Sequence, residues 1–185
     1  KYRGEVLGRP ASFNVDIYNQ WIQDVQRVEF PPDPTGISAS IAVTANVPSE
    51  QVRGIELDGS FMPFDWLEIG GNGAITDARY TDGAINLFGT PFLYGPPADT
   101  PKASGVLYGV VYFPTDDTIG QITLRGEVYS QTSMYFSSAS RANAPDTRLP
   151  GYTLVSGRLQ WDNVMGSHVS AALFGKNLTD EEYFV

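Results

Sequence analysis

The sequence predicts an all-β fold, and three observations support that prediction. Apolar and polar residues alternate along several segments, as they do on the two faces of a strand. Aromatic residues make up 12% of the 185 residues and charged residues only 18%, a composition that suits a pleated surface. No comparably long segment shows a 3.6-residue helical stripe. We therefore predict an antiparallel, up-and-down sheet.

The alternating segments give the expected strands in chain order. They cover residues 11–18, 54–61, 67–76, 122–129, 155–162 and 169–176. In the second of them Ile55 and Leu57 alternate with Glu56 and Asp58, which predicts one apolar and one polar face. The segment 102–113 is also strand-like, but both of its faces are fairly apolar, so the pattern does not assign its register.

Short and long connections alternate between these strands. The short ones carry Pro, Asp, Asn and Gly, as tight turns do, and they are 62–65, 114–120 and 163–167. The long ones are polar, and they span roughly 29–50, 77–101 and 132–150. Strict alternation places all the long loops at one end of the sheet. Transmembrane β-barrels have this asymmetry, with short periplasmic turns and long extracellular loops, so we expect a portion of such a barrel.

Aromatic residues gather near the short connections. They are Phe61, Phe64, Trp66, Tyr112, Phe113 and Trp161. Aromatic side chains at the same end of successive hairpins predict a girdle at a membrane interface. Packing at the end of a soluble β-core is the other explanation.

Charge and composition exclude several classes of partner and chemistry. The formal net charge is −9, from 12 Lys and Arg against 21 Asp and Glu, so bulk electrostatics disfavour nucleic acid and anionic membrane surfaces. The absence of cysteine excludes disulfides and thiolate chemistry. There is no run of about 18 apolar residues, so no transmembrane helix is expected, but a transmembrane strand needs only about 10 residues.

Five motifs, in order along nearly the whole chain, resemble those of one family. They are VRGIELDGSFMPFDWL at 52–67, IGGNGAITDARYTD at 69–82, TPK at 100–102, PGYTL at 150–154 and NLTDEEY at 177–183. With these motifs the chain resembles the β-barrel of TonB-dependent outer-membrane receptors. The resemblance implies one incomplete domain, 1–185, that forms the C-terminal part of a 22-stranded barrel around a plug. The plug, its TonB-contacting box and the final strand do not occur in the sequence, and the start KYRGEVLGRP suggests processing or an excerpt.

The resemblance also implies a function and a location. The intact protein would bind a scarce nutrient at the bacterial cell outer membrane and import it to the periplasm, with energy from the TonB–ExbB–ExbD complex through the absent N-terminal part. The small-molecule ligand would be a siderophore–iron complex or similar, with an oligosaccharide or cobalamin as alternatives. The implied partners are the rest of the barrel, the plug domain and outer-membrane lipid.

Two other classes of protein remain open. One is a soluble all-β binding module, such as a carbohydrate-binding sandwich, and the other is an outer-membrane enzyme or a passive porin. These classes of protein differ in what the two faces of the strands contact. A sandwich buries one face against a second sheet, whereas a barrel piece turns its apolar face to lipid and its polar face to the lumen.

No residue pattern indicates catalysis, a cofactor or a metal site. His168 is the only histidine and lies beside a turn, so a turn-proximal His is expected. Glu181 and Glu182 are adjacent and would point in opposite directions on an extended chain, so solvated loop charges are expected. Asp116 and Asp117 have few oxygen neighbours, which favours turn chemistry over a cation site. The sequence therefore predicts a protein that is not an enzyme.

Two sets of residues are candidates for function by position. The first would face the lumen, where it would hold the plug or line a substrate path, and it comprises Glu56, Asp58, Glu68, Asn72, Arg125, Glu127, Arg158 and Lys176. The second would bind ligand from the extracellular loops, and it comprises Tyr80, Phe88, Phe92, Tyr94, Tyr135, Phe136 and Arg141. Aromatic and Arg side chains are suitable binding anchors, although packing within the loops explains them equally well.

Overall fold

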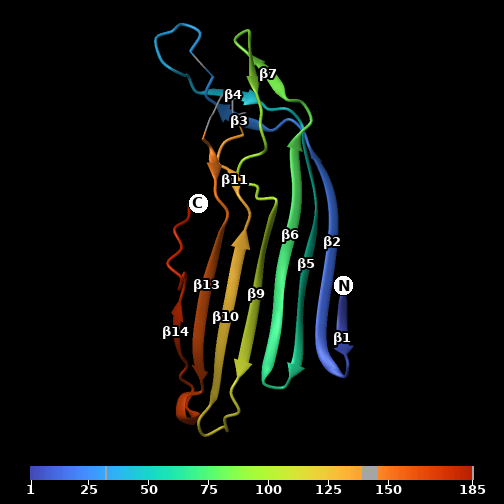
Figure 1. The fold of residues 1–185 in the computed structure, drawn as a ribbon, viewed down its shortest axis with the longest axis vertical. Helices are drawn as coiled ribbons and strands as arrows, with labels where there is room; N and C mark the ends of the chain where they lie inside the picture. The colour runs from blue at the N-terminus through green and yellow to red at the C-terminus, as the bar shows by residue number, and fades with distance from the viewer. Residues whose placement is uncertain (32, 139–145, 185) are drawn as a thin grey trace.

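An eight-stranded antiparallel sheet forms most of the molecule (Figure 1). The computed structural model describes residues 1–31, 33–138 and 146–184. The strands of the main sheet are β1 (Tyr2–Val6), β2 (Arg9–Ile22), β5 (Glu50–Phe64), β6 (Leu67–Tyr80), β9 (Ala103–Tyr112), β10 (Gln121–Gln131), β13 (Tyr152–Asp162) and β14 (Ala171–Gly175). Each of them pairs with the next main strand along the chain. The predicted up-and-down antiparallel sheet is therefore confirmed.

The turns differ from the sequence prediction in detail. Strand β5 runs on to Phe64, so the turn predicted at 62–65 lies at Asp65–Trp66, and a register shift after Phe61 absorbs the extra residues. The sequence pattern did not predict strand β1 or its turn at Leu7–Gly8. Both turn residues have positive φ, 54° and 71°, as type I′ hairpin turns require, but Leu-Gly is not the Asn-Gly pair that signals such a turn.

Cross-strand register assigns every main strand an apolar and a polar face. Because residues alternate along a strand and direct partners share a face, one row sets the pattern. Ile17 pairs with Ile55, and Ile55 with Ile75, on the apolar face. The neighbouring partners Asp16 and Glu56 lie on the polar face.

The register also assigns strand β9, which the sequence left open. Leu107 pairs with Gly71 and Val128 on the apolar face. Tyr108 pairs with Gly70 and Glu127 on the polar face. The polar-face positions of β9 are therefore aromatic and β-branched rather than charged, which explains why its alternation was weak.

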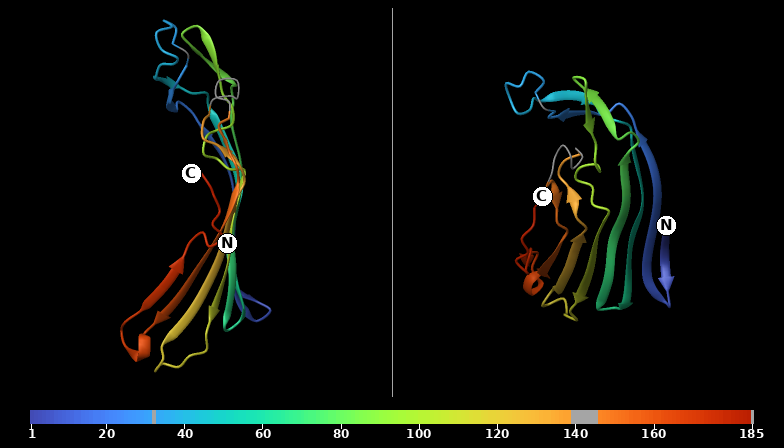
Figure 2. Two further views of the ribbon diagram at one scale, coloured as in Figure 1. Left: turned by 60° about the vertical axis from the view of Figure 1, so that its left-hand side comes forward. Right: turned by 45° about the horizontal axis from the view of Figure 1, so that its top comes forward.

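The long connections carry small sheets of their own at one end of the molecule (Figures 1 and 2). These hairpins are β3 (Gln26–Glu29) with β4 (Val43–Asn46), β7 (Ala84–Leu87) with β8 (Thr90–Leu93), and β11 (Met134–Tyr135) with β12 (Arg148–Leu149). We call the described parts of 23–49, 81–102 and 132–151 the loop cap. The prediction of polar loops missed this internal structure.

Figure 2 shows a twisted, curved sheet with β1 and β14 at its two edges. Each of these edge strands pairs on one side only, so the described strands do not close into a barrel. A 3₁₀ turn, η1 (Val164–Gly166), lies between β13 and β14. No helix in the described part of the chain is long and apolar enough to cross a membrane.

Candidate functional site

The apolar face of the sheet is left open to its surroundings. Ile17 is 78% exposed and Leu107 is 72% exposed, and both lie in the middle of long strands. Among the described residues, the other three sheets have only two strands each, so no second layer of comparable size covers this face. The described strands therefore do not form the inter-sheet core that a soluble sandwich needs.

The polar face carries a connected hydrogen-bond network. The hydroxyls of Tyr108 and Tyr112 donate to the two carboxylate oxygens of Glu68 at 2.9 and 3.0 Å. The guanidinium of Arg125 lies 3.9 Å from the ring centroid of Tyr108, a cation–π distance. Arg125 also forms an ion pair with Glu127 on the same strand, with Nη2 and Oε2 3.1 Å apart. Polar side chains of three neighbouring strands therefore restrain one another.

A glycine makes room for this network. Gly70 is the cross-strand partner of Tyr108, and a Cβ added to it would meet the Tyr108 hydroxyl at 2.5 Å. The tyrosine ring therefore lies across Gly70 toward Glu68. Glu68 and Arg125 are both predicted lumen-facing residues, whereas the two tyrosines that link them could not be predicted, because the sequence pattern does not assign the register of 102–113.

Charge separates across the polar face. A hollow of about 250 Å³ on the β10–β13–β14 side is lined by Arg125, Glu127, Ser156, Arg158, Phe174 and Lys176, so three cations face one carboxylate. A second hollow, on the β2–β5–β6 side, is lined by three carboxylates, from Asp16, Glu56 and Asp58, and by Asn72. The polar face of the sheet is therefore basic toward β14 and acidic toward β2.

The predicted lumen set shares this polar face. The register places Glu56, Asp58, Glu68, Asn72, Arg125, Glu127 and Arg158 on it, and Lys176 follows β14 at the edge of the basic hollow. Whether these residues hold a plug or line a substrate path stays a prediction.

The loop candidates divide into buried and exposed groups. Phe92 and Tyr94 are only 4% and 8% exposed, and they form the core of the loop cap with Val47 and Leu87. Tyr80 packs against the same core, with its ring 4.9 Å from that of Tyr94. In this arrangement these three aromatic residues act in packing, and a ligand would reach them only if the cap opened.

Two loop aromatics are accessible. Phe88 is 56% exposed at the tip of the β7–β8 hairpin, and Phe136 is 55% exposed just after β11. Tyr135 lies half-buried in β11. Arg141 lies outside the described residues, so its role as a ligand contact stays a prediction.

A buried carboxylate joins two hairpins of the loop cap. The hydroxyl of Tyr94 donates to Oε1 of Glu29 at 3.2 Å, and Glu29 is 7% exposed. Burial raises the pKa of the Glu29 carboxyl above its ordinary value of 4.5, although the Tyr94 hydrogen bond and the charge of Arg27 favour ionisation. Burial and the nearby Glu29 charge also raise the pKa of Tyr94.

The aromatic residues near the short turns do not all belong to one girdle. Phe64 and Trp66 stack with ring centroids 5.3 Å apart, and each is about half exposed at the end of the apolar face. Phe113 is 40% exposed, and its backbone N–H bonds to the Ile122 carbonyl. Tyr112, however, points to the polar face and bonds to Glu68, so its assignment to the girdle is wrong. Adjacent residues on a strand point to opposite faces, so closeness to a turn in the sequence does not place two neighbouring aromatic residues on the same face.

Asp116 serves turn chemistry. Its Oδ1 accepts bonds from the Thr118 hydroxyl and from the backbone N–H groups of Thr118 and Ile119. These bonds hold the pKa of the Asp116 carboxyl below its usual value. Among the described residues, no three His, Cys, Asp or Glu side chains come together in a way that could hold a metal ion.

The NLTD segment continues alongside β13 beyond the end of β14. The amide of Asn177 bonds in both directions to the backbone of Glu181, and the Leu178 N–H donates to the Val155 carbonyl. The ring of Tyr183 then packs against that of Tyr152, with centroids 4.6 Å apart, so the motif has a structural role here.

Comparison with protein families agrees with this architecture. The family model described as "TonB dependent receptor-like, beta-barrel" matches residues 2–178. The chain belongs to this receptor family. A search of curated protein sequences found no match.

Two solved structures share the fold of this receptor-barrel chain. The ferric yersiniabactin uptake receptor FyuA from Yersinia pestis is similar with a TM-score of 0.66 and 15% identity, over 98% of this chain and 24% of that one. BauA, the ferric preacinetobactin receptor from Acinetobacter baumannii, is similar with a TM-score of 0.56 and 17% identity, over 96% of this chain and 24% of that one. The chain thus spans about a quarter of the length of these receptors.

Proposed function

We propose that the chain forms part of the barrel wall of a TonB-dependent outer-membrane receptor that imports a scarce nutrient to the periplasm. The observation that supports this best is the use of the two sheet faces. One face is apolar and open, as a lipid-facing wall must be, and the other carries charges and a polar network, as a lumen does. Membership of the receptor family adds the mode of action: binding outside the cell, then passage driven through TonB.

The polar wall has a defined role in this proposal. The basic hollow with Arg125, Arg158 and Lys176 and the acidic hollow with Glu56 and Asp58 would hold a plug of complementary charge, or guide a ligand past it. Half-exposed ion pairs are weak, so such contacts can be exchanged during transport. The plug, the remaining strands and the TonB–ExbB–ExbD complex are the implied partners.

A siderophore–iron complex is the ligand class we propose first. The two structurally similar receptors are named for ferric siderophores, and the accessible loop aromatics, Phe88 and Phe136, suit a planar or partly apolar ligand. An oligosaccharide or cobalamin is the alternative cargo. The soluble-module alternative has lost its support, because the described strands provide no second sheet to cover the apolar face.

Uptake by the full-length protein tests this function. Cells that express it as their only receptor are given ⁵⁵Fe-loaded catecholate, hydroxamate and phenolate chelates, labelled cobalamin and labelled maltodextrin. We expect one ferric chelate to accumulate, and a protonophore to abolish uptake but not surface binding. Uptake that survives the protonophore would point to a passive porin instead.

Loop variants connect this test to the structure. Phe88→Ala with Phe136→Ala should weaken surface binding of the transported chelate about tenfold or more, because exposed aromatic anchors dominate small-ligand contacts. Phe113→Ala is the matched control, since it removes an exposed aromatic ring at the opposite end of the sheet. Equal losses in both variants would contradict the loop site.

A further inference from the structure

The apolar face ends abruptly at the loop end of the strands, and arginines begin there. On β6 its positions run from Leu67 to Ile75, and the next position on the same face is Asp77, followed by Arg79. Asp77 lies ten positions after Leu67, about 34 Å along the strand, so the first polar position lies roughly 25 Å above Leu67 at a tilt of about 45°. That height matches the apolar band of about 25 Å in transmembrane barrels.

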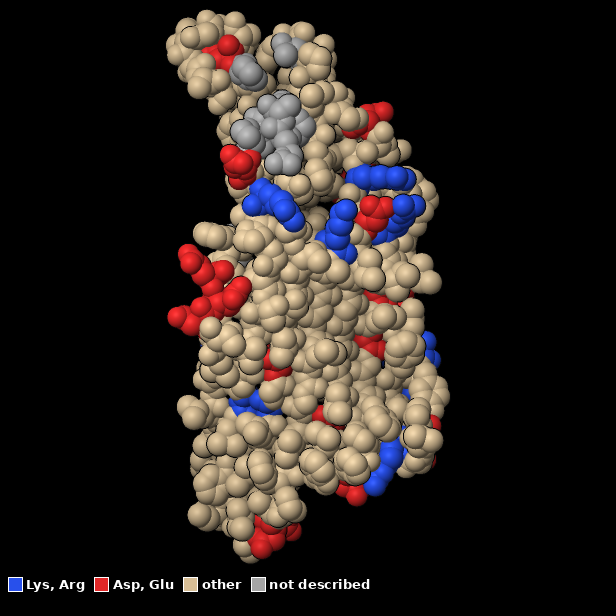
Figure 3. Space-filling view, viewed as in Figure 1, with Lys and Arg blue, Asp and Glu red and all other residues tan. Residues whose placement is uncertain are grey.

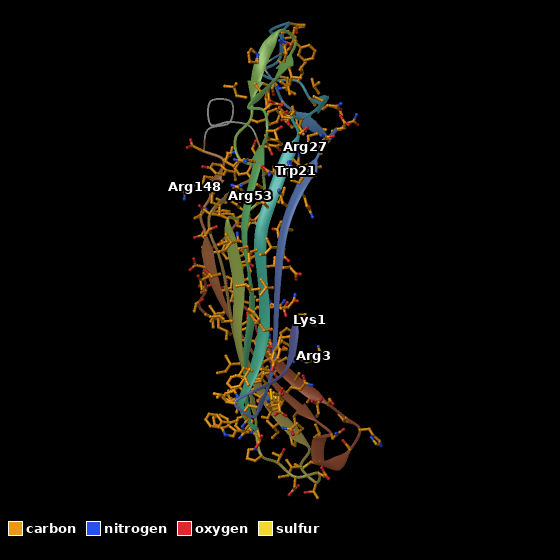
Figure 4. All side chains as sticks on the ribbon, turned by 90° about the vertical axis from the view of Figure 1, so that its right-hand side faces the viewer. Lys1, Arg3, Trp21, Arg27, Arg53 and Arg148 are labelled. Atoms are coloured by element: carbon orange, nitrogen blue, oxygen red, sulfur yellow. The ribbon has the colours of Figure 1, made fainter. Side chains whose placement is uncertain are left out.

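Two polar rows cross the sheet directly above this band. In the first row Asn19, Arg53 and Asp77 are cross-strand partners. In the second row Trp21, Gln51 and Arg79 are partners. Figure 3 shows Lys and Arg residues gathered in a band below the loops, whereas acidic and basic residues are scattered singly over the strands beneath. Figure 4 shows Trp21, Arg53 and Arg148 at nearly one height.

The side chains of these rows are accessible and pre-oriented. Arg53 is 52% exposed and forms an ion pair of 2.7 Å with Asp77. Arg79 donates to Oε1 of Gln51 at 2.9 Å, and Gln51 donates to Asn19 at 3.0 Å. Trp21 is 64% exposed beside them. The amide chain fixes the guanidinium of Arg79, while Arg53 is held by a half-exposed ion pair of a kind that contributes little to stability.

We propose that Arg53, Arg79 and Trp21 form a binding surface for the phosphate groups of anionic lipids at the loop-side boundary of the membrane. The proposal rests on the membrane-spanning role given above. A guanidinium presents a planar fork that matches phosphate oxygens, and an indole ring suits the interface between acyl chains and headgroups. The net charge of −9 disfavours anionic surfaces in bulk, but basic side chains at the membrane surface act locally, within about 10 Å.

Asp77 is the built-in competitor at this surface. Its carboxylate is paired with Arg53, so a phosphate must displace it. Asp77→Asn should therefore strengthen lipid binding, whereas a purely structural Arg53–Asp77 pair predicts no gain.

Lipid retention by the full-length protein tests the proposal. The protein in neutral detergent is titrated with dioleoyl phosphatidylglycerol, and native mass spectrometry counts the bound lipids. Phosphatidylcholine and inorganic phosphate are the comparison probes. We expect Arg53→Gln with Arg79→Gln to weaken phosphatidylglycerol binding at least fivefold at 0.1 M salt, and Asp77→Asn to tighten it about twofold. The difference between wild type and the double variant should shrink at 0.5 M salt because surface charges are screened.

Arg9→Gln is the matched control. Arg9 lies at the turn end of the sheet, where it pairs with Asp65 at 2.6 Å, so the variant removes a similar ion-paired arginine from the other boundary. An equal loss in Arg9→Gln, or no loss in the double variant together with no gain in Asp77→Asn, would overturn the proposal. Competition by inorganic phosphate at equal phosphate concentration would assign a free-anion site instead and overturn the lipid assignment. Insertion into phosphatidylcholine vesicles is scored separately: failure to insert contradicts the membrane role, whereas insertion without lipid discrimination contradicts only this inference.

Discussion

The loop cap buries apolar side chains, whereas the eight-stranded sheet leaves apolar side chains exposed on one face. In the described residues the buried hydrophobic side chains are Val47, Leu87, Phe92 and Tyr94, all in the loop cap. The much larger sheet leaves Ile17 and Leu107 mostly exposed. The cap therefore has a small core of its own, whereas the described residues supply no apolar layer against the apolar face of the sheet. The loops, usually the least ordered part of a sheet protein, are here the part that packs like a soluble domain.

The largest expected effect falls on the core of the loop cap. Phe92→Ala should raise the free energy of the folded cap by about 3–5 kcal/mol, because it leaves a cavity among Val47, Leu87 and Tyr94. Hydrogen exchange should quicken in the β3–β4 and β7–β8 hairpins and stay unchanged in β5 and β6. Phe88→Ala on the same hairpin is the control, since that ring is exposed. If exchange quickened equally along β5 and β6, the cap would not be an independent unit.

The apolar face of the sheet should respond to charge instead. Leu107→Arg places a cation near the middle of the lipid-facing wall and should cost about 2–4 kcal/mol in a bilayer. Ala74→Arg puts the same side chain in the acidic hollow, where its cross-strand partner is Glu56, and should cost far less. Denaturant titrations of the full-length protein in phospholipid vesicles measure both. Equal losses would contradict the assignment of the two faces.

The polar network should contribute a smaller, coupled stabilisation. Glu68→Gln weakens two hydrogen bonds to a charged acceptor, from Tyr108 and Tyr112, and should cost about 1–2 kcal/mol. In a double-mutant cycle with Tyr112→Phe, the coupling energy should be about 0.5–1.5 kcal/mol. Glu56→Gln on the same face is the control. Strict additivity of Glu68→Gln and Tyr112→Phe would show that the network does not act as a unit.

The smallest expected effect is a pH dependence confined to the loop cap. Because burial raises the pKa of Glu29, the folded cap favours the protonated carboxyl. That stabilisation is fully present below about pH 4.5 and is lost as the pH rises through the raised pKa. Exchange in the β7–β8 hairpin should therefore be slower at pH 4.5 than at pH 7, after correction for intrinsic rates. Glu29→Gln should remove the difference, and Glu5→Gln on strand β1 should not.

Sequence alone determined the overall architecture. Period-two alternation and the order of short and long connections gave the up-and-down sheet, and seven of its eight strands, because a strand with one apolar face must repeat every second residue. The same alternation placed Glu56, Arg125 and Arg158 on one face, and motif order gave the family that the matching family model confirms.

Tertiary structure alone decided the features that depend on partners far apart in the chain. The face of Tyr112 and the network around Glu68 required the register of β9, which a strand with two apolar faces does not encode locally. The burial of Phe92 and Tyr94 required the contact between two loop hairpins. The arginine rows appeared only when β2, β5 and β6 were set side by side, since Arg53 and Arg79 lie 26 residues apart in sequence but in successive rows of one sheet.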